Sequence, residues 1–228
     1  MENYYLINYG LITLATLITI MAQIWVSSAY NKYKKILGSK DLTGYETAKK
    51  VLSMNHLDNI LILETKGNLT DHYDPQKKVV KLSGDIYNGS SIASLAVAAH
   101  ECGHAIQDQE NYLPMRIRSS LVPYVNICTR IGYFAIVLGV IFSYTLIQVG
   151  IILLLAMLLF QLVTLPVEIN ASRRALKQLE KLNLIDKEDK KYTKKMLTAA
   201  AFTYVAALLS TLLEILRYLL IFTSRDDR

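Results

Sequence analysis

Long apolar runs separated by charged segments set the pattern of this chain. Residues 3–31 carry no charged side chain, and residues 131–167 form a second uncharged run that is too long for a single membrane span. A helix of about 20 apolar residues crosses a bilayer. The pattern therefore predicts a first transmembrane helix over residues 1–30, a transmembrane hairpin over residues 127–167 and a fourth span over residues 196–223. A cleaved signal peptide is the alternative for the first run, but the run is long and has no basic start.

Shorter periodic segments fill the first gap between these runs, residues 31–126, and predict a small α+β unit. Thr43-Gly44-Tyr45-Glu46 has the form of a capping box, so we expect a helix from here to about Met54. Residues 59–65 and Lys78–Ser83 have strand character, and Asp74-Pro75 is a turn signal between them. The helical segment 168–195 fills the second gap, and residues 224–228 form a tail.

Composition and charge agree with a membrane protein. Hydrophobic residues make up 52% of the 228 residues, and the net charge is +6. The lysines and arginines flank apolar runs, so they indicate orientation in a lipid bilayer rather than nucleic-acid binding. The positive-inside rule places Lys32–Lys35, Arg116–Arg130 and Arg173–Lys195 in the cytoplasm and both termini outside, as expected for a multi-pass protein of the plasma membrane.

The residue types that carry chemistry lie on the segment Ser91–Asp108, SIASLAVAAHECGHAIQD, which contains an HExxH pattern. A helix places positions i and i+4 on one face, so His100 and His104 can hold one metal ion between them. Glu101 lies beside the pair and can act as a general base toward water at that metal. Zinc suits two neutral nitrogen ligands and leaves a position open for water. The alternative is a core helix with two satisfied histidines.

A catalytic zinc needs a third protein ligand. His56 and His72 both precede the motif, and Glu168 follows the predicted hairpin. Because two spans return the chain to the side of the motif, Glu168 is the better candidate, at the start of a helix on the membrane surface. Ala171, Ser172 and Ala175 then provide a small-residue face for close helix packing. The alternative is a helix N-terminal carboxylate favoured by the helix dipole.

Three segments together carry a family resemblance: LTDHYDPQKKVVKLS, SIASLAVAAHECGHAIQ and LPVEINASRRAL. They resemble the bacterial neutral zinc metallopeptidases of the YugP-like type, over nearly the whole chain. The resemblance implies a mostly α integral membrane protein with about four transmembrane helices and a small gluzincin-like α+β protease unit of two or three short strands and the HExxH helix. It also implies that His100, His104 and Glu168 bind Zn²⁺ and that Glu101 is the base. The wider group often has an acidic residue four positions after the ligand Glu, where this chain has Ser172.

The same resemblance implies that an edge strand before the motif helix binds peptide by strand addition, and Lys78–Ser83 matches that place. His72 could reach the site and stabilise an oxyanion. The alternative for His72 is an ordinary turn held by the side chains of Asp71 and Asp74.

The function expected from the sequence is a membrane-bound zinc endopeptidase that hydrolyses a peptide or membrane-protein substrate at the cytoplasmic surface. A catalytically inactive zinc-dependent membrane scaffold or chaperone is an alternative from another class, although pure metal binding would not require Glu101. A site-2-type intramembrane protease is a second alternative, but the apolar stretch before His100 is too short to span a membrane. Glu214 and Arg217 lie within the fourth predicted span, either as a self-paired couple or as a functional intramembrane pair.

Overall fold

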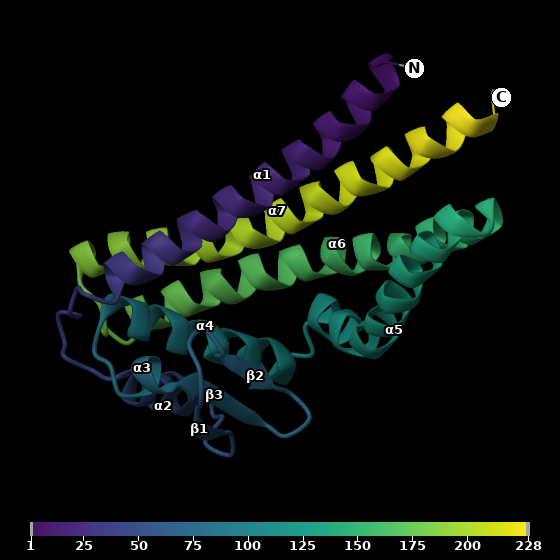
Figure 1. The fold of residues 1–228 in the computed structure, drawn as a ribbon. Helices are drawn as coiled ribbons and strands as arrows, with labels where there is room; N and C mark the ends of the chain where they lie inside the picture. Colours follow the sequence, from purple (N-terminus) through teal and green to yellow (C-terminus); the bar gives the residue numbers. More distant parts are fainter. Residues whose placement is uncertain (1, 227–228) are drawn as a thin grey trace. The chain divides into compact units, whose positions relative to one another are not determined.

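The computed structural model describes residues 2–226 (Figure 1). The elements in chain order are α1 (Glu2–Tyr33), α2 (Gly44–Met54), β1 (Leu61–Thr65), β2 (His72–Asp74), β3 (Val79–Ser83), α3 (Gly84–Tyr87), α4 (Ile92–Gln109), α5 (Leu113–Ile141), α6 (Tyr144–Lys181) and α7 (Lys187–Asp226). The chain divides into two compact units. Residues 2–23, 117–165 and 203–226 form the apolar unit, and residues 24–116 and 166–202 form the mixed unit.

Within the described residues, four helices are long and apolar enough to cross a membrane. The candidate spans are Leu6–Tyr33, Leu113–Gly139, Thr145–Lys181 and Lys187–Leu220. The prediction of a mostly helical chain with four apolar helices and a small sheet is therefore confirmed. The hairpin between the second and third of these helices turns at residues 142–143.

The helices of the apolar unit approach one another through small and polar side chains. At the crossing of α5 and α6, a Cβ added to Gly150 would lie 2.8 Å from the carbonyl oxygen of Gly132. Small residues at such crossings let helix backbones come close in a membrane. The hydroxyl of Tyr133 donates to Glu214 over 3.0 Å, and the Arg217 guanidinium lies 4.4 Å from the centre of the Tyr218 ring. Both charged residues of the fourth span therefore have aromatic partners within this unit.

The mixed unit contains the sheet, in the order β1-β3-β2. Strands β1 and β3 are parallel, and β2 and β3 are antiparallel. The predicted strand Lys78–Ser83 is therefore the central strand and not the edge strand that we expected. Its side chains explain this place, because Val79, Val80 and Leu82 are buried on both faces of the sheet. Strand β2 was missed, since its three residues run into the Asp74-Pro75 turn signal.

The predicted start of α2 is confirmed, and α4 also begins with a side-chain cap. Thr43 and Glu46 form the expected capping box at α2, and the Ser91 side chain accepts a hydrogen bond from the Ser94 backbone at α4. Helix α4 packs against α2 and the sheet, and most of its residues are buried. The small side chains of its alanines let these neighbouring elements come close. This packing holds the motif helix in the interior of the unit.

Glu168 does not begin a helix, which corrects the sequence prediction. It lies inside α6, which runs without interruption from Tyr144 to Lys181 and contains Pro166. A proline removes one backbone donor from a helix. A long helix tolerates it when the turns on both sides stay hydrogen-bonded and packed, and Val167 and Ala171 beyond it are fully buried.

Candidate metal centre

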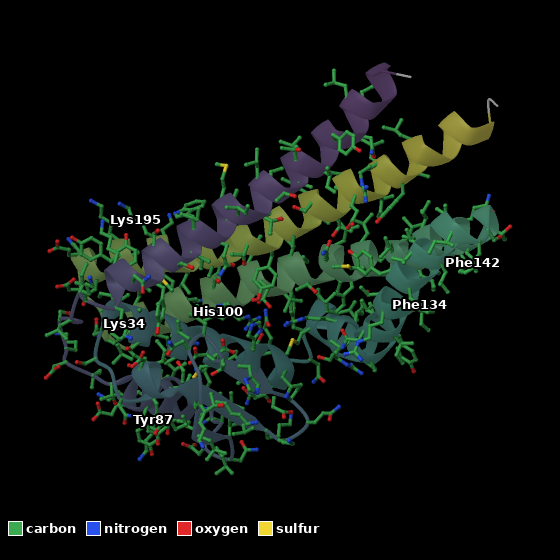
Figure 2. The ribbon with its side chains drawn as sticks, in the orientation of Figure 1. Lys34, Tyr87, His100, Phe134, Phe142 and Lys195 are labelled. Carbon is green, nitrogen blue, oxygen red and sulfur yellow. The ribbon has the colours of Figure 1, made fainter. Side chains whose placement is uncertain are left out.

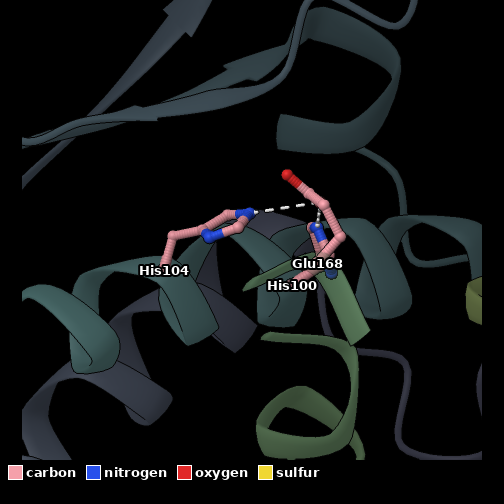
Figure 3. Close-up of side chains that lie close together, drawn as sticks. All are labelled: His100, His104 and Glu168. Carbon is pink, nitrogen blue, oxygen red and sulfur yellow. Dashed lines mark hydrogen bonds and ion pairs between the residues drawn. The ribbon is translucent and has the colours of Figure 1, made fainter. Parts of the chain in front are cut away.

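Two helices of the mixed unit bring the predicted ligands together. Helix α4 supplies His100 and His104, and the second half of α6 supplies Glu168 (Figure 3). The Oε2 atom of Glu168 lies 3.2 Å from Nε2 of His100 and 3.5 Å from Nε2 of His104. Ligands at zinc distances of about 2.0–2.1 Å in a tetrahedral arrangement lie about 3.4 Å from one another. Both separations from the carboxylate match this value, and all three ligand atoms lie within 4.8 Å of one another.

A glycine allows the two helices to come this close. A Cβ added to Gly103 would lie 2.6 Å from the carbonyl oxygen of Ala171, far inside van der Waals contact. Gly103 stands between the two histidines on α4, and Ala171 follows Glu168 by one turn of α6. The missing side chain at position 103 therefore sets the distance between the histidine pair and the carboxylate.

A network of buried amides fixes His104. The Nε2 of Gln107 donates to the Val167 carbonyl over 2.8 Å and to the Asn170 side chain over 2.9 Å. These donations turn the amide oxygen of Gln107 toward Nδ1 of His104, at 3.0 Å. An amide oxygen only accepts, so Nδ1 of His104 carries the hydrogen.

This tautomer decides what the site can bind. In the neutral ring of His104, Nε2 then presents a lone pair, and that lone pair faces a carboxylate oxygen of Glu168. Two electron-rich atoms in a buried site require a proton or a metal ion close to both. The donor set of two imidazoles and one carboxylate, with one Nε2 prepared as a ligand, fits zinc.

His100 is held differently. Its Nδ1 lies 3.2 Å from the hydroxyl of Ser172, a group that can either donate or accept. The hydroxyl therefore leaves both tautomers of His100 open. Ser172 occupies the position at which the wider group often has an acidic residue, and it contacts His100 without adding a charge.

The network behind His104 continues to the surface of the unit. Arg174 donates from Nε to the Asn170 side chain over 2.6 Å and pairs with Glu110 over 2.7 Å. Glu110 is the C-cap residue of α4, so this ion pair joins the end of α4 to α6. We did not predict the roles of Gln107, Asn170 and Arg174, although the i, i+3 spacing of His104 and Gln107 placed the amide on the correct face.

Glu101 lies beside the three ligands and is 8% exposed. Burial raises the pKa of its carboxyl to about 7, and the neighbouring His100 opposes that shift. The carboxylate accepts a hydrogen bond from the backbone N–H of Tyr73 on β2. A carboxyl group with a pKa in this range both takes up and releases a proton near neutral pH.

Cys102, the next residue of the motif, points away from the ligands. Its Sγ lies 3.7 Å from the carbonyl oxygen of Ala48 on α2, and burial raises the pKa of its thiol. The thiol therefore stays protonated at neutral pH and packs as a small apolar side chain.

His72 lies on β2, where its side chain is exposed. Its Nδ1 lies 2.8 Å from the carbonyl oxygen of Thr70, which must accept, so Nδ1 carries the hydrogen. Nε2 of the neutral ring then has no hydrogen to donate to an oxyanion. Among the described residues, the group whose ligand atoms lie within 4.8 Å of one another consists of His100, His104 and Glu168, and it includes neither His72 nor His56.

Comparison with known proteins agrees with this geometry. The model of a protein family described as "Putative neutral zinc metallopeptidase" matches residues 8–223. The chain belongs to this family. It is also 42% identical over 218 residues to the "Putative membrane protease YugP" of Bacillus subtilis (strain 168), covering 95% of this chain and 97% of that protein. No solved structure gives a significant match.

Proposed function

We propose that this protein is a zinc endopeptidase of the gluzincin type, anchored in the plasma membrane by four helices. The observation that carries this proposal is the pair of lone-pair-bearing atoms, Nε2 of His104 and Oε2 of Glu168, 3.5 Å apart beside a buried glutamate. Family membership and the name of the Bacillus subtilis relative, "Putative membrane protease YugP", support the same function.

Each residue of the site has a distinct task in hydrolysis. His100, His104 and Glu168 would hold the ion. Zinc bound there would supply a Lewis acid that polarises the scissile carbonyl and makes water more acidic. Glu101 takes the proton from the attacking water and then gives it to the leaving amine. The Tyr73 N–H favours the ionised form of Glu101, which is the form that takes up the proton.

The substrate would be an extended peptide segment, free or part of a membrane protein. Strand β2 lies at the edge of the sheet, and its Tyr73 N–H points away from β3 toward Glu101. A peptide that lies along this edge would pass beside the general base. Strand β2 therefore takes the role that the sequence assigned to Lys78–Ser83.

We place the site on the cytoplasmic side, because the basic segments Lys32–Lys35 and Arg173–Lys195 both adjoin apolar helices. Replacing both native cysteines with alanine and Glu180 with cysteine provides a test. A membrane-impermeant thiol reagent should not label position 180 in intact cells and should label it after lysis. Strong labelling in intact cells would place the site outside.

The activity is tested with Glu101→Gln. The variant keeps the shape of the side chain and removes the carboxylate that takes the proton. General acid–base catalysis typically contributes about 10²–10⁴-fold. Cleavage of an unstructured protein such as casein in detergent should fall by that factor or more, while zinc content and melting temperature stay those of the wild type.

Two alternatives give other results in the same measurement. A zinc-dependent scaffold or chaperone would show no casein cleavage in either protein. A site-2-type protease would need the motif helix within a membrane span, and α4 is not among the helices apolar enough to cross a membrane in the described part of the chain. Cleavage by the Gln variant at the wild-type rate would overturn the proposed mechanism.

A further inference from the structure

A groove of about 640 Å³ lies in the mixed unit between the end of α1 and the start of α7. The two helices run in opposite directions there, as the pairing of Tyr33 with Tyr192 and of Trp25 with Phe202 shows. The uncharged run of α1 ends at Asn31, and that of α7 begins at Met196. The groove therefore lies where two candidate membrane helices reach the same membrane surface.

The rim of the groove is strongly basic. It carries Lys32 from α1 and Lys191, Lys194 and Lys195 from α7, and no carboxylate lines it. Figure 2 shows Lys195 at this end of the two helices. Within the part of the chain that the structure describes, none of these four lysines forms an ion pair.

Lysines next to the groove differ from those on its rim. Lys34, two residues beyond Lys32, pairs with Asp85, and Lys190 pairs with Glu180 over 2.9 Å. Two lysines next to the groove are thus neutralised, whereas the described residues supply no counter-ion to the four on its rim. Four unneutralised cations around one groove attract an anion.

The lining below the rim is apolar and aromatic. The Trp25 ring packs against that of Phe202 with ring centres 4.9 Å apart and a tilt of 56°, and Trp25 is still 45% exposed. Ala29 and Tyr33 continue the lining along α1. A groove with a cationic rim and an apolar wall matches a molecule that carries both a negative headgroup and a hydrocarbon chain.

We propose that this groove binds one anionic phospholipid, with its phosphate among the four lysines and one acyl chain along Trp25. The proposal does not depend on peptidase activity. A soluble phosphate ester would neutralise the lysines of the rim but would leave the aromatic wall exposed to water. An acidic protein segment would satisfy the rim as well, but the groove opens where the helices meet lipid.

Trp25 makes the test direct, because it is the chain's one tryptophan and it lines the groove. Bromine atoms on lipid chains quench tryptophan fluorescence on contact. The full chain is reconstituted in phosphatidylcholine vesicles that contain a minor fraction of phosphatidylglycerol. Bromine is placed on the chains of one lipid in one sample and of the other lipid in the second. Quenching by phosphatidylglycerol well above its share of the lipid is the expected result.

Three variants locate the effect. Each lysine beside an anionic lipid contributes about a five-fold preference. Lys194→Gln with Lys195→Gln should therefore lower the preference for phosphatidylglycerol about 25-fold, and Lys32→Gln on the other helix should lower it about five-fold. Lys49→Gln with Lys50→Gln changes the charge equally at an exposed pair on α2 and should leave the preference unchanged.

Several results would overturn the proposal. Quenching in proportion to lipid content, with no excess from phosphatidylglycerol, would show that the groove has no preference. An excess that survives in the Lys194 and Lys195 double variant would place the lipid elsewhere. Loss of the excess on adding soluble glycerol phosphate would show that the site takes a free phosphate ester and not a lipid. For each variant, the sample with brominated phosphatidylcholine is the control, because quenching there shows that Trp25 still contacts lipid.

Discussion

His104 and His100 lie one helical turn apart, yet their surroundings differ. His104 is 6% exposed, and the fully buried Gln107 holds its Nδ1 hydrogen through an amide that is itself bonded to α6. The side chain of His100 is 16% exposed, and its Nδ1 contacts the hydroxyl of Ser172. The first arrangement fixes one tautomer and one ring position. The second allows the ring to adjust.

The difference suggests separate roles for the two histidines in the proposed metal site. His104 would orient the ion, and His100 would be free to adjust its position. Groups that hold the far nitrogen of a ligand histidine typically change metal affinity by about 10–100-fold. Substitutions around His104 and around His100 should therefore change metal affinity by different amounts.

The largest effect is expected from Glu168→Ala, because this carboxylate is shared by both histidines. Losing one of three ligands should weaken zinc affinity by more than the 10–100-fold of a supporting residue. Zinc content after dialysis against a weak chelator measures it. His72→Ala is the control and should keep its zinc. Equal zinc in wild type and Glu168→Ala, with none in His100→Ala, would mean that another group is the third ligand.

Gly103→Ala should disturb both histidines at once, since its new methyl group would push against the Ala171 carbonyl. Overpacking of this kind typically costs about 1–3 kcal/mol of the free energy of unfolding. We expect a lower melting temperature together with weaker zinc binding. Gly10→Ala on α1 is a matched helical control, because a methyl group there meets nothing within 4 Å. A melting temperature as high as that of Gly10→Ala would show that α4 and α6 can accommodate a methyl group at position 103.

Gln107→Leu tests the surroundings of His104 alone. The variant keeps the volume but removes the acceptor for His104 and the donor to Val167. Zinc affinity should fall by about 10–100-fold. Gln107→Glu retains the acceptor for the His104 hydrogen and should recover part of the loss. If both variants bind zinc as the wild type does, the amide network does not set the tautomer.

Ser172→Ala tests the surroundings of His100 and should have the smallest effect. The hydroxyl that it removes is neutral and leaves the His100 tautomer open, so we expect a loss of zinc affinity below that of Gln107→Leu. Ser172→Asp sharpens the comparison by adding the charge found at this position in the wider group. It should fix the Nδ1 hydrogen of His100 and strengthen zinc binding. A larger loss from Ser172→Ala than from Gln107→Leu would reverse the roles assigned to the two histidines.

The parts of the site that depend on local periodicity were predictable from sequence. The i, i+4 spacing placed His100 and His104 on one face, and the alternation of apolar and charged runs indicated the four long helices. Glu168 followed from the number of spans between it and the motif. These arguments need only the pattern along the chain and the thickness of a bilayer.

Other features depend on contacts between distant segments. The role of Gln107 requires the Val167 carbonyl, 60 residues away, and no local pattern reports that contact. Strand β2 exists because β3 and Glu101 hold its backbone, while its sequence signals a turn. The change from apolar to charged residues near Glu168 suggested a helix start, but hydropathy reports the surroundings of a helix and not its ends.

The central claim is that His100, His104 and Glu168 hold zinc, and X-ray absorption at the zinc edge of the purified protein tests it most directly. The account predicts about one zinc per chain, with nitrogen and oxygen neighbours at about 2.0–2.2 Å and the scattering signature of two imidazole rings. It also predicts no sulfur neighbour at about 2.3 Å, because Cys102 points toward Ala48. A sulfur neighbour, a single imidazole ring or a purified protein that binds no zinc would contradict it.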